Sequence, residues 1–329
     1  MAIIANTETT YVGIGNRELL LDTIYNIAPA ETPVLTNASK VTLNRELIDW
    51  QTDTLRAAAA NAQLEGDDSP AFPAFVPTVR LRNYAQISRE LVIVSGTQDI
   101  VNKAGRGSDL AYKVAQGSLA LKRDLELNLL SNVLGNAGAA ATARVTCGLP
   151  NWIKDNTDKG GGAGADPVWT TTSGITTPTT AVVDGTQRPF VETSLRNVLQ
   201  KIYTAGGNPS TIMCGPTTKQ TISTFGGVAT KTFYQDAAAP SVIVSAADVY
   251  VSDYSKLAVI PNRFIRQVSS NFNDCFVLDW DLMAVGFLRE FQVQELAKTG
   301  DAEKRQLIVE WALVVKNQAG LGIVRDLNN

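Results

Sequence analysis

Alternating apolar and polar residues mark two strands in the first third of the chain. Residues 41–54 and residues 79–94 both follow this pattern, the second with apolar positions that include Ile87, Leu91 and Ile93. A period of two is typical of β-strands with two different faces. We therefore expect two long strands that face each other as a hairpin.

The segment between these strands, residues 56–75, is polar and rich in alanine, glycine and proline. It is much longer than the usual hairpin loop of about 2–5 residues. Because a two-stranded hairpin cannot bury both of its faces, we expect this arm to lie on a neighbouring subunit. The candidate inter-subunit contacts are Arg56, Glu65, Asp67, Asp68, Phe72 and Phe75.

A long helix is predicted after Gly107. Ser108 suits the N-cap, Asp109 is favourable in the first turn, and we expect the helix to end near Leu134. Apolar residues form one stripe, and charged residues, among them Glu126, are placed on the remaining surface. The stripe consists of Leu110, Val114, Leu121, Leu125 and Leu129.

Residues 135–190 interrupt the regular pattern with glycine runs and a threonine-rich stretch. This composition predicts a surface excursion or flexible loop without a core of its own. An α/β portion follows, with a helix over residues 191–205, a buried strand over 211–214 and a helix that begins at Pro216.

The rest of the chain predicts further β-structure and an N-terminal arm. Residues 1–37 should hold at most one short helix, around residues 17–27, because Pro29 and Pro33 limit regular structure. The elements together predict an α+β fold. Later strands are expected within residues 248–253, 257–260, 275–289, 291–296 and 306–315.

The chain of 329 residues contains no histidine. Ser-His-Asp, Cys-His and HExxH chemistry are therefore excluded. Cys147, Cys214 and Cys275 are too far apart in sequence for a CxxC motif, so we expect neither a metal site nor a cofactor. Their odd number and scatter indicate a reducing compartment.

A formal charge of −3 does not indicate a basic surface that binds nucleic acid. A mildly acidic protein shell could still enclose DNA passively. The first residues do not form a signal peptide, and no apolar run reaches the ~20 residues of a membrane helix. We expect a protein made in the cytoplasm that has no membrane partner.

Two pairs of carboxylates remain as candidates for chemistry. Asp279 and Asp281 flank Trp280 in a predicted strand, where both would share one face and could hold a cation or perform acid–base chemistry. An exposed strand face is the commoner explanation. Asp67 and Asp68 have too few oxygen ligands nearby in sequence for calcium. A carboxylate-dependent cytoplasmic hydrolase using Asp279 and Asp281 stays open as an alternative.

Short stretches along the chain, together with the order of the elements, carry a family resemblance. They are residues 94–98, 122–126, 261–263, 296–301, 310–313 and 316–319. These stretches, and the succession of hairpin arm, long helix, α/β portion and β-rich return, are similar to tailed-phage major capsid proteins of the Hong Kong 97 type.

This resemblance implies a non-enzymatic subunit whose hexamers and pentamers close into an icosahedral head around double-stranded DNA. It implies a place in the virion, assembly in the host bacterial cytoplasm, and a portal protein as partner. The implied domains are an N-terminal arm (1–39), an extended loop (40–98), a peripheral domain with the spine helix (99–190), an axial domain (191–262) and a β-rich return (263–329).

The chain departs from some relatives in two ways. Their extended loop carries a lysine that forms an isopeptide bond with a neighbour's asparagine, yet no lysine lies between Lys40 and Lys103. We therefore expect non-covalent overlap or a decoration protein to hold the shell. No long helical scaffolding segment begins this chain, so a separate scaffolding protein, or none, is expected. An encapsulin-like nanocompartment shell is the nearest alternative.

Overall fold

The computed structural model describes residues 30–62, 65–66, 74–225 and 248–328. One hydrophobic core lies beneath a long helix and a second lies beneath a shorter one. The helices are α1 (Pro33–Asn37), α2 (Gly96–Ile100), α3 (Asp109–Leu130), α4 (Glu192–Thr204) and α5 (Pro216–Ser223). Single 3₁₀ turns occupy Leu149–Trp152, Trp280–Leu282 and Gln318–Gly320.

The strands of these residues form three larger sheets and a two-stranded ribbon. The first sheet has the order β1 (Ser39–Thr42), β14 (Met283–Glu295), β15 (Ala302–Val315), β4 (Gln86–Ser95). The second has the order β5 (Thr157–Asp158), β16 (Gly322–Val324), β13 (Cys275–Leu278), β8 (Thr211–Cys214), β10 (Lys256–Pro261), β9 (Val249–Val251). The third has the order β2 (Leu47–Thr52), β3 (Val79–Tyr84), β7 (Ile175–Thr180), β6 (Val168–Thr172), and the ribbon pairs β11 (Gln267–Val268) with β12 (Asn271–Phe272).

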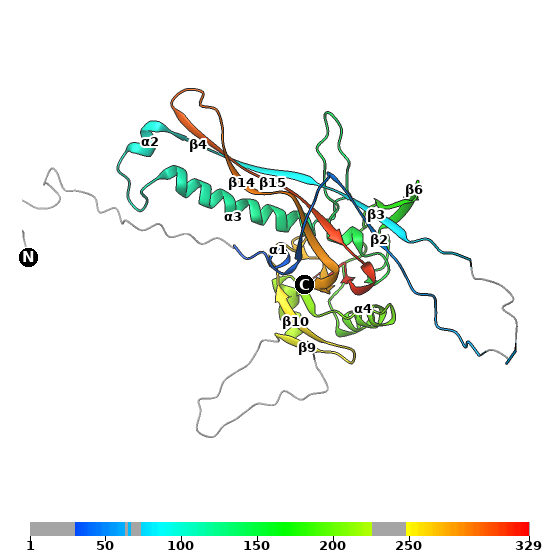
Figure 1. Cartoon of the computed structure of the whole chain (residues 1–329). Coiled ribbons are helices and arrows are strands. Elements are labelled where there is room, and N and C mark those ends of the chain that lie inside the picture. Colours follow the sequence, from blue (N-terminus) through cyan, green and yellow to red (C-terminus); the bar gives the residue numbers. More distant parts are fainter. Residues whose placement is uncertain (1–29, 63–64, 67–73, 226–247, 329) are drawn as a thin grey trace, which may run out of the picture.

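Helix α3 lies along β4 and β15 (Figure 1). Leu121, Leu125 and Leu129 are buried in the core, and Leu110 and Val114 pack against it as partly buried side chains. The apolar stripe predicted from the sequence is therefore confirmed.

The start of α3 is also as predicted. The Ser108 hydroxyl accepts a hydrogen bond from the Ala111 amide at 3.3 Å, which satisfies one of the free N–H groups of the first turn. The predicted end at Leu134 is wrong: the helix stops at Leu130. Ser131 turns to extended backbone, and its hydroxyl donates to the Asn128 carbonyl at 2.8 Å.

The α/β portion forms as the sequence predicts. Helix α4 covers one side of the second sheet, β8 is buried along its whole length, and β9 pairs antiparallel with β10. The buried face of α4 consists of Leu195, Val198, Leu199 and Ile202.

The two long strands predicted at residues 41–54 and 79–94 are each divided. The first becomes β1 and β2, which lie in different sheets, and the second becomes β3 and β4, with a break at Ala85. At this break the Ala85 amide donates to the Glu46 carbonyl at 2.9 Å. The alternating pattern continues through the break because it depends on which face of the strand is buried. It does not reveal that β3 and β4 pair with different strands.

Residues 135–190 contribute to the core, so the prediction of a surface excursion is wrong for part of this segment. Leu149, Trp152 and Ile153 are fully buried, and the threonine-rich stretch forms most of β6 and β7. Strand β7 is held in place because it pairs with β3. The buried apolar residues lie between polar, glycine-rich stretches. The average composition of the segment is therefore polar, although part of it is buried.

Pro33 begins a helix, whereas the sequence suggested that it would limit one. It stands at the first position of α1, where the missing N–H costs nothing. The helix predicted around residues 17–27 lies outside the described residues.

Glu126 of α3 was placed on the polar surface, and this is wrong: its side chain is fully buried. Its Oε1 accepts from the Val34 amide at 2.9 Å and the Asn262 side-chain amide at 2.7 Å, and its Oε2 accepts from the Leu35 amide at 3.0 Å. We call these contacts the Glu126 junction. Burial raises the pKa of Glu126 above its usual value, although the three hydrogen bonds lower it in part.

The junction satisfies groups that would otherwise be unpaired. The Val34 and Leu35 amides belong to the first turn of α1 and have no acceptor within that helix. A carboxylate there also complements the positive end of the helix. Glu126 therefore joins the N-terminal part of the chain, the long helix and the loop after β10.

We predict that Leu121→Asp abolishes soluble, folded protein, because an uncompensated charge in this core costs several kcal/mol. Leu127→Asp is the matched control, since Leu127 lies on the same helix and is 51% exposed. Circular dichroism and gel filtration measure the outcome. Equal yields of folded protein from both variants would contradict the placement of the stripe.

We predict that Glu126→Gln destabilises the subunit by roughly 1–3 kcal/mol, because its NH₂ group would face an N–H donor and leave a buried group unpaired. Urea unfolding of unassembled subunits measures the change. Glu290→Gln makes the same chemical change at an exposed position and should be nearly neutral. Equal stability of the two variants would refute the role of the junction.

Candidate assembly surfaces

The hairpin arm, residues 47–84, is the most prominent candidate surface. Strand β2 pairs antiparallel with β3, from Leu47 opposite Tyr84 to Thr52 opposite Val79. Beyond these strands, residues 53–62 and 74–78 have no regular secondary structure, and they extend away from the body of the subunit (Figure 1).

An ion-pair cluster crosses the two strands of this arm. Asp49 of β2 accepts hydrogen bonds from Arg82 of β3 at 2.7 and 2.8 Å and also pairs with Arg80. The hydrogen bond from Arg82, with the charges of both arginines, lowers the pKa of Asp49, and burial opposes this effect. On one face of the arm, these ion pairs favour the observed register of β2 against β3.

Three tryptophans attach the base of the arm to the body. The ring of Trp50 on β2 lies 5.2 Å from that of the buried Trp152, whose ring lies 5.7 Å from that of Trp169 on β6. Each such aromatic pair contributes about 0.5–1.5 kcal/mol beyond the area it buries. No sequence pattern predicts this cluster, because its members come from three separate segments.

The tip of the arm exposes apolar side chains. Leu55 is 99% exposed and Phe75 is 88% exposed. Of the predicted contact residues, Arg56 and Glu65 are exposed as well. Within the described part of the chain, the Arg56 side chain donates a hydrogen bond only to the neighbouring Ala57 carbonyl. The other predicted contacts, Asp67, Asp68 and Phe72, lie outside the described residues.

Strand β4 presents a second apolar surface. Ile87, Leu91 and Ile93, which are apolar positions of the predicted alternating strand, are all exposed. The buried positions are Val92 and Val94, which face α3. Both sets alternate, so the pattern alone could not decide which set is covered within the subunit.

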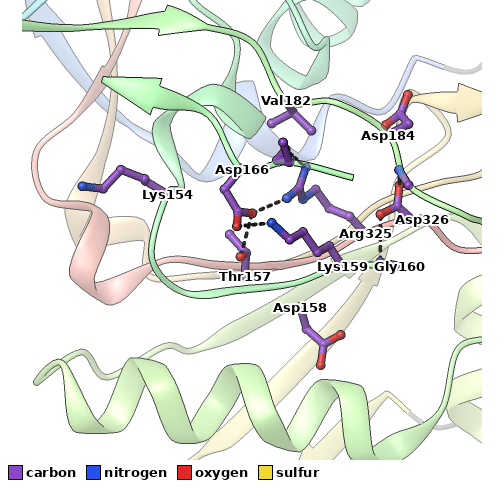
Figure 2. Close-up of polar contacts among 12 residues, drawn as sticks. Lys154, Thr157, Asp158, Lys159, Gly160, Asp166, Val182, Asp184, Arg325 and Asp326 are labelled. Carbon is purple, nitrogen blue, oxygen red and sulfur yellow. Dashed lines mark hydrogen bonds and ion pairs between the residues drawn. The ribbon is translucent and has the colours of Figure 1, made fainter. Parts of the chain in front are cut away.

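A polar cluster joins the glycine-rich loop at residues 160–164 to Arg325 and Asp326, which directly follow β16 (Figure 2). Asp166 pairs with Lys159 at 2.6 Å and with Arg325, and it accepts from the Thr157 hydroxyl at 2.8 Å. Burial alone would raise the pKa of Asp166, but its hydrogen bonds and the charge of Arg325 lower it. This carboxylate is neutralised by its partners and is not poised as a base.

Asp326 holds the same region through backbone amides. Its Oδ2 accepts from the Gly160 amide and its Oδ1 from the Gly185 amide, both at 2.9 Å. The residue adopts a φ of 63°, which is uncommon for a residue other than glycine. The glycine-rich segment is therefore fixed to the body at Gly160, where the sequence suggested a flexible loop.

Asp279 and Asp281 do not share a strand face as predicted. Asp279 is the N-cap of the 3₁₀ turn Trp280–Leu282 and Asp281 lies within it, and the Asp279 side chain accepts a hydrogen bond from the Asp281 amide at 3.1 Å. One carboxylate thus caps the turn that carries the other. The predicted strand at residues 275–289 is interrupted here because β13 and β14 belong to different sheets.

The cysteines are buried. Cys214 and Cys275 lie opposite each other on β8 and β13, and the hydrogen bond between their thiols, with burial, raises the pKa of Cys275. Burial raises the pKa of Cys147 to about 12. Across the described ranges, no group of three or more His, Cys, Asp or Glu side chains could hold a metal ion, and no helix is long and apolar enough to cross a membrane.

Several solved structures have a similar fold. The capsid of a native GTA particle matches with a TM-score of 0.63 and 12% identity, over 97% of this chain and 98% of that chain. A chain from Gordonia phage Cozz matches with a TM-score of 0.60 and 13% identity, over 99% and 96%. The SrpI encapsulin from Synechococcus elongatus PCC 7942 matches with a TM-score of 0.55 and 10% identity, over 95% and 92%. The predicted α+β fold of the Hong Kong 97 type is confirmed.

Sequence comparisons identify the family. A major capsid protein of Escherichia phage Phieco32 is 36% identical over 106 residues, which are 32% of this chain and 30% of that protein's length. The family model described as SU10 major capsid protein matches residues 3–328. This match covers nearly the whole chain, and the chain therefore belongs to the SU10 major capsid protein family.

Proposed function

We propose that this chain is the head subunit of a tailed double-stranded DNA phage, whose hexamers and pentamers close into an icosahedral shell. The observation that carries the proposal is the hairpin arm, which is anchored at its base and exposes Leu55 and Phe75 at its tip. Large apolar side chains held away from the body stabilise nothing within the subunit, and they are typical of interaction surfaces. A neighbouring copy of the chain supplies the missing cover.

The arrangement of the body supports a division of labour among the predicted domains. In this proposal the extended loop (40–98) overlaps the next subunit, and the peripheral domain with α3 (99–190) gives it a rigid base. The axial domain (191–262) lies around the capsomer centre. The N-terminal arm (1–39) overlaps neighbouring subunits, and its last part, α1, packs on α3 of its own chain. The return (263–329) supplies the long strands β14 and β15 to the first sheet.

The shell is held together without a loop-lysine crosslink in this proposal, because residues 41–102 contain no lysine. Apolar overlap of the arms, or a decoration protein, provides the stability. A portal protein is the further proposed partner, and the shell assembles either with a separate scaffolding protein or with none. Enclosed DNA needs no specific binding site, in keeping with a net charge of −3.

We further infer that no residue is catalytic. The chain lacks histidine, and the carboxylates with the strongest contacts are held in ion pairs or by backbone amides. The proposed place of the subunit is the virion, after assembly in the cytoplasm of the bacterial host.

Electron microscopy of the expressed protein tests this function. The proposal requires closed particles tens of nanometres wide, and a monomer under all assembly conditions would overturn it. The encapsulin neighbour motivates the second candidate, a nanocompartment shell. Particles purified from infected cells distinguish the two, since a phage head contains DNA and a nanocompartment contains a protein cargo.

We predict that Phe75→Asp leaves the subunit folded but prevents shell formation, because a charge replaces a ring that the neighbour must cover. Thermal unfolding of the free subunit should change little, since this residue is 88% exposed there. Phe75→Leu keeps an apolar side chain and should restore particles in electron micrographs. Normal shells from Phe75→Asp would remove Phe75 from the interface.

We predict that the order of the arm depends on pH through Asp49. Its pKa in the folded subunit is lower than the value of ~3.9 in unfolded chains. The ion pairs therefore contribute fully above about pH 4, and their contribution is lost as the pH falls through the lower, folded value. Hydrogen exchange of residues 47–52 should show this acid loss in the natural chain.

Asp49→Asn provides the comparison. This variant should already exchange faster at neutral pH, by an amount that corresponds to roughly 1 kcal/mol, and its exchange should lack the additional acid-dependent step. An identical acid response in both proteins would show that the cluster does not order the arm.

A further inference from the structure

A groove runs between α3 and the outer edge of β4. It has a volume of about 440 Å³ and is lined by residues of both elements, together with Ala30. Strand β4 stands at the end of the first sheet, so among the described strands none pairs with this edge. Exposed strand edges promote unwanted pairing between molecules and are commonly covered by another part of the chain.

The groove is lined by both apolar and charged residues. Helix α3 contributes Leu119 and Ala120, and β4 contributes Leu91 and Val92. Gly117 of α3 also lines the groove, and a Cβ atom there would lie only 3.2 Å from the Cγ atom of Glu90.

The charges at the groove favour an acidic occupant. Lys113 and Arg123 line it from α3, and Glu90 lines it from β4, which leaves one excess positive charge. An apolar segment with a small negative charge would match both features.

The chain itself enters the structure at this groove. Ala30, the first described residue, is one of the lining residues, so the residues directly before it must start here. In residues 17–29, apolar side chains recur at Leu20, Ile24 and Ile27, a spacing that puts them on one face of a helix. The same segment carries Arg17, Glu18 and Asp22 and thus one excess negative charge.

We propose that residues 17–29 dock in the α3–β4 groove of their own chain. The apolar face of the segment covers Leu119, Ala120 and the edge of β4, and its acidic residues lie towards Lys113 and Arg123. The connection at Ala30 holds the segment at the groove and favours its own chain over a second copy. This deepens the proposed function, on which it rests only for the overlap of the rest of the N-terminal arm with neighbouring subunits.

The docked segment has a physical consequence for assembly. It covers the free edge of β4 in the unassembled subunit. Without this cover, the edge would pair indiscriminately with strand edges of other molecules. The hairpin arm is then the main exposed surface through which subunits bind one another. Contacts between subunits therefore form in one arrangement.

Cysteine crosslinking tests this placement. Ile24→Cys is combined with Leu119→Cys in one chain, and Leu20→Cys with Lys113→Cys in a second, each treated with a short bismaleimide. The three natural cysteines are buried and should react little. Ile24→Cys combined with Val183→Cys is the control, since Val183 is exposed but does not line the groove.

The expected result is an intrachain crosslink, seen as monomer-sized protein on denaturing gels with the linked peptides found by mass spectrometry. Its yield should be several-fold higher than in the control pair. Dimer-sized products from both groove pairs would overturn the proposal and assign the groove to a second copy. Yields equal to the control in both pairs would also overturn it.

Electron microscopy of the same samples separates this inference from the proposed function. Closed particles without the intrachain crosslink would refute the docking alone. If the intrachain crosslink forms but neither the variants nor the natural chain form particles under the same conditions, the shell function is refuted and the docking remains intact.

Discussion

A two-stranded hairpin has no second layer of its own, and this constraint decides how the rest of the subunit is built. The hairpin arm can be positioned only at its base, where β7 extends the sheet and where Trp50 packs against Trp152. The described residues beyond the paired strands, 53–62, 65–66 and 74–78, are exposed in the single subunit. Its apolar side chains gain burial energy only when another molecule covers them.

A projecting arm is useful only if the body that carries it is rigid. The Glu126 junction and the Asp166 and Asp326 contacts provide this rigidity by joining segments that are distant in sequence. Each uses a carboxylate to satisfy backbone amides or to neutralise cations in places where water is excluded. Removal of one partner would leave the other unpaired, so these contacts define one arrangement of the body.

The sequence was sufficient wherever a local pattern has one structural meaning. Helix α3 and helix α4 were predicted from an apolar stripe, and for α3 the capping by Ser108 was predicted as well. The sequence also predicted Arg56, Glu65 and Phe75 as inter-subunit contacts, because a two-stranded arm cannot bury both of its faces. All three are exposed in the subunit, and their contacts stay a prediction.

The sequence was insufficient wherever the meaning depends on a distant partner. Alternation did not show that β1 and β2 join different sheets, nor that Ile87 and Leu91 face outwards while Val92 faces α3. A glutamate on a helix looks like a solvated residue until the first turn of α1 is placed against it. The tryptophan cluster was missed for the same reason, since its members meet only in the folded chain.

The central claim is that the hairpin arm is completed by another copy of the chain. Hydrogen exchange of residues 53–62 and 74–78, compared between assembled particles and dissociated subunits at the same pH, measures this most directly. The account predicts fast exchange in the free subunit and strong protection in the particle. Equally fast exchange in both states would show that the arm remains exposed after assembly and would contradict the account.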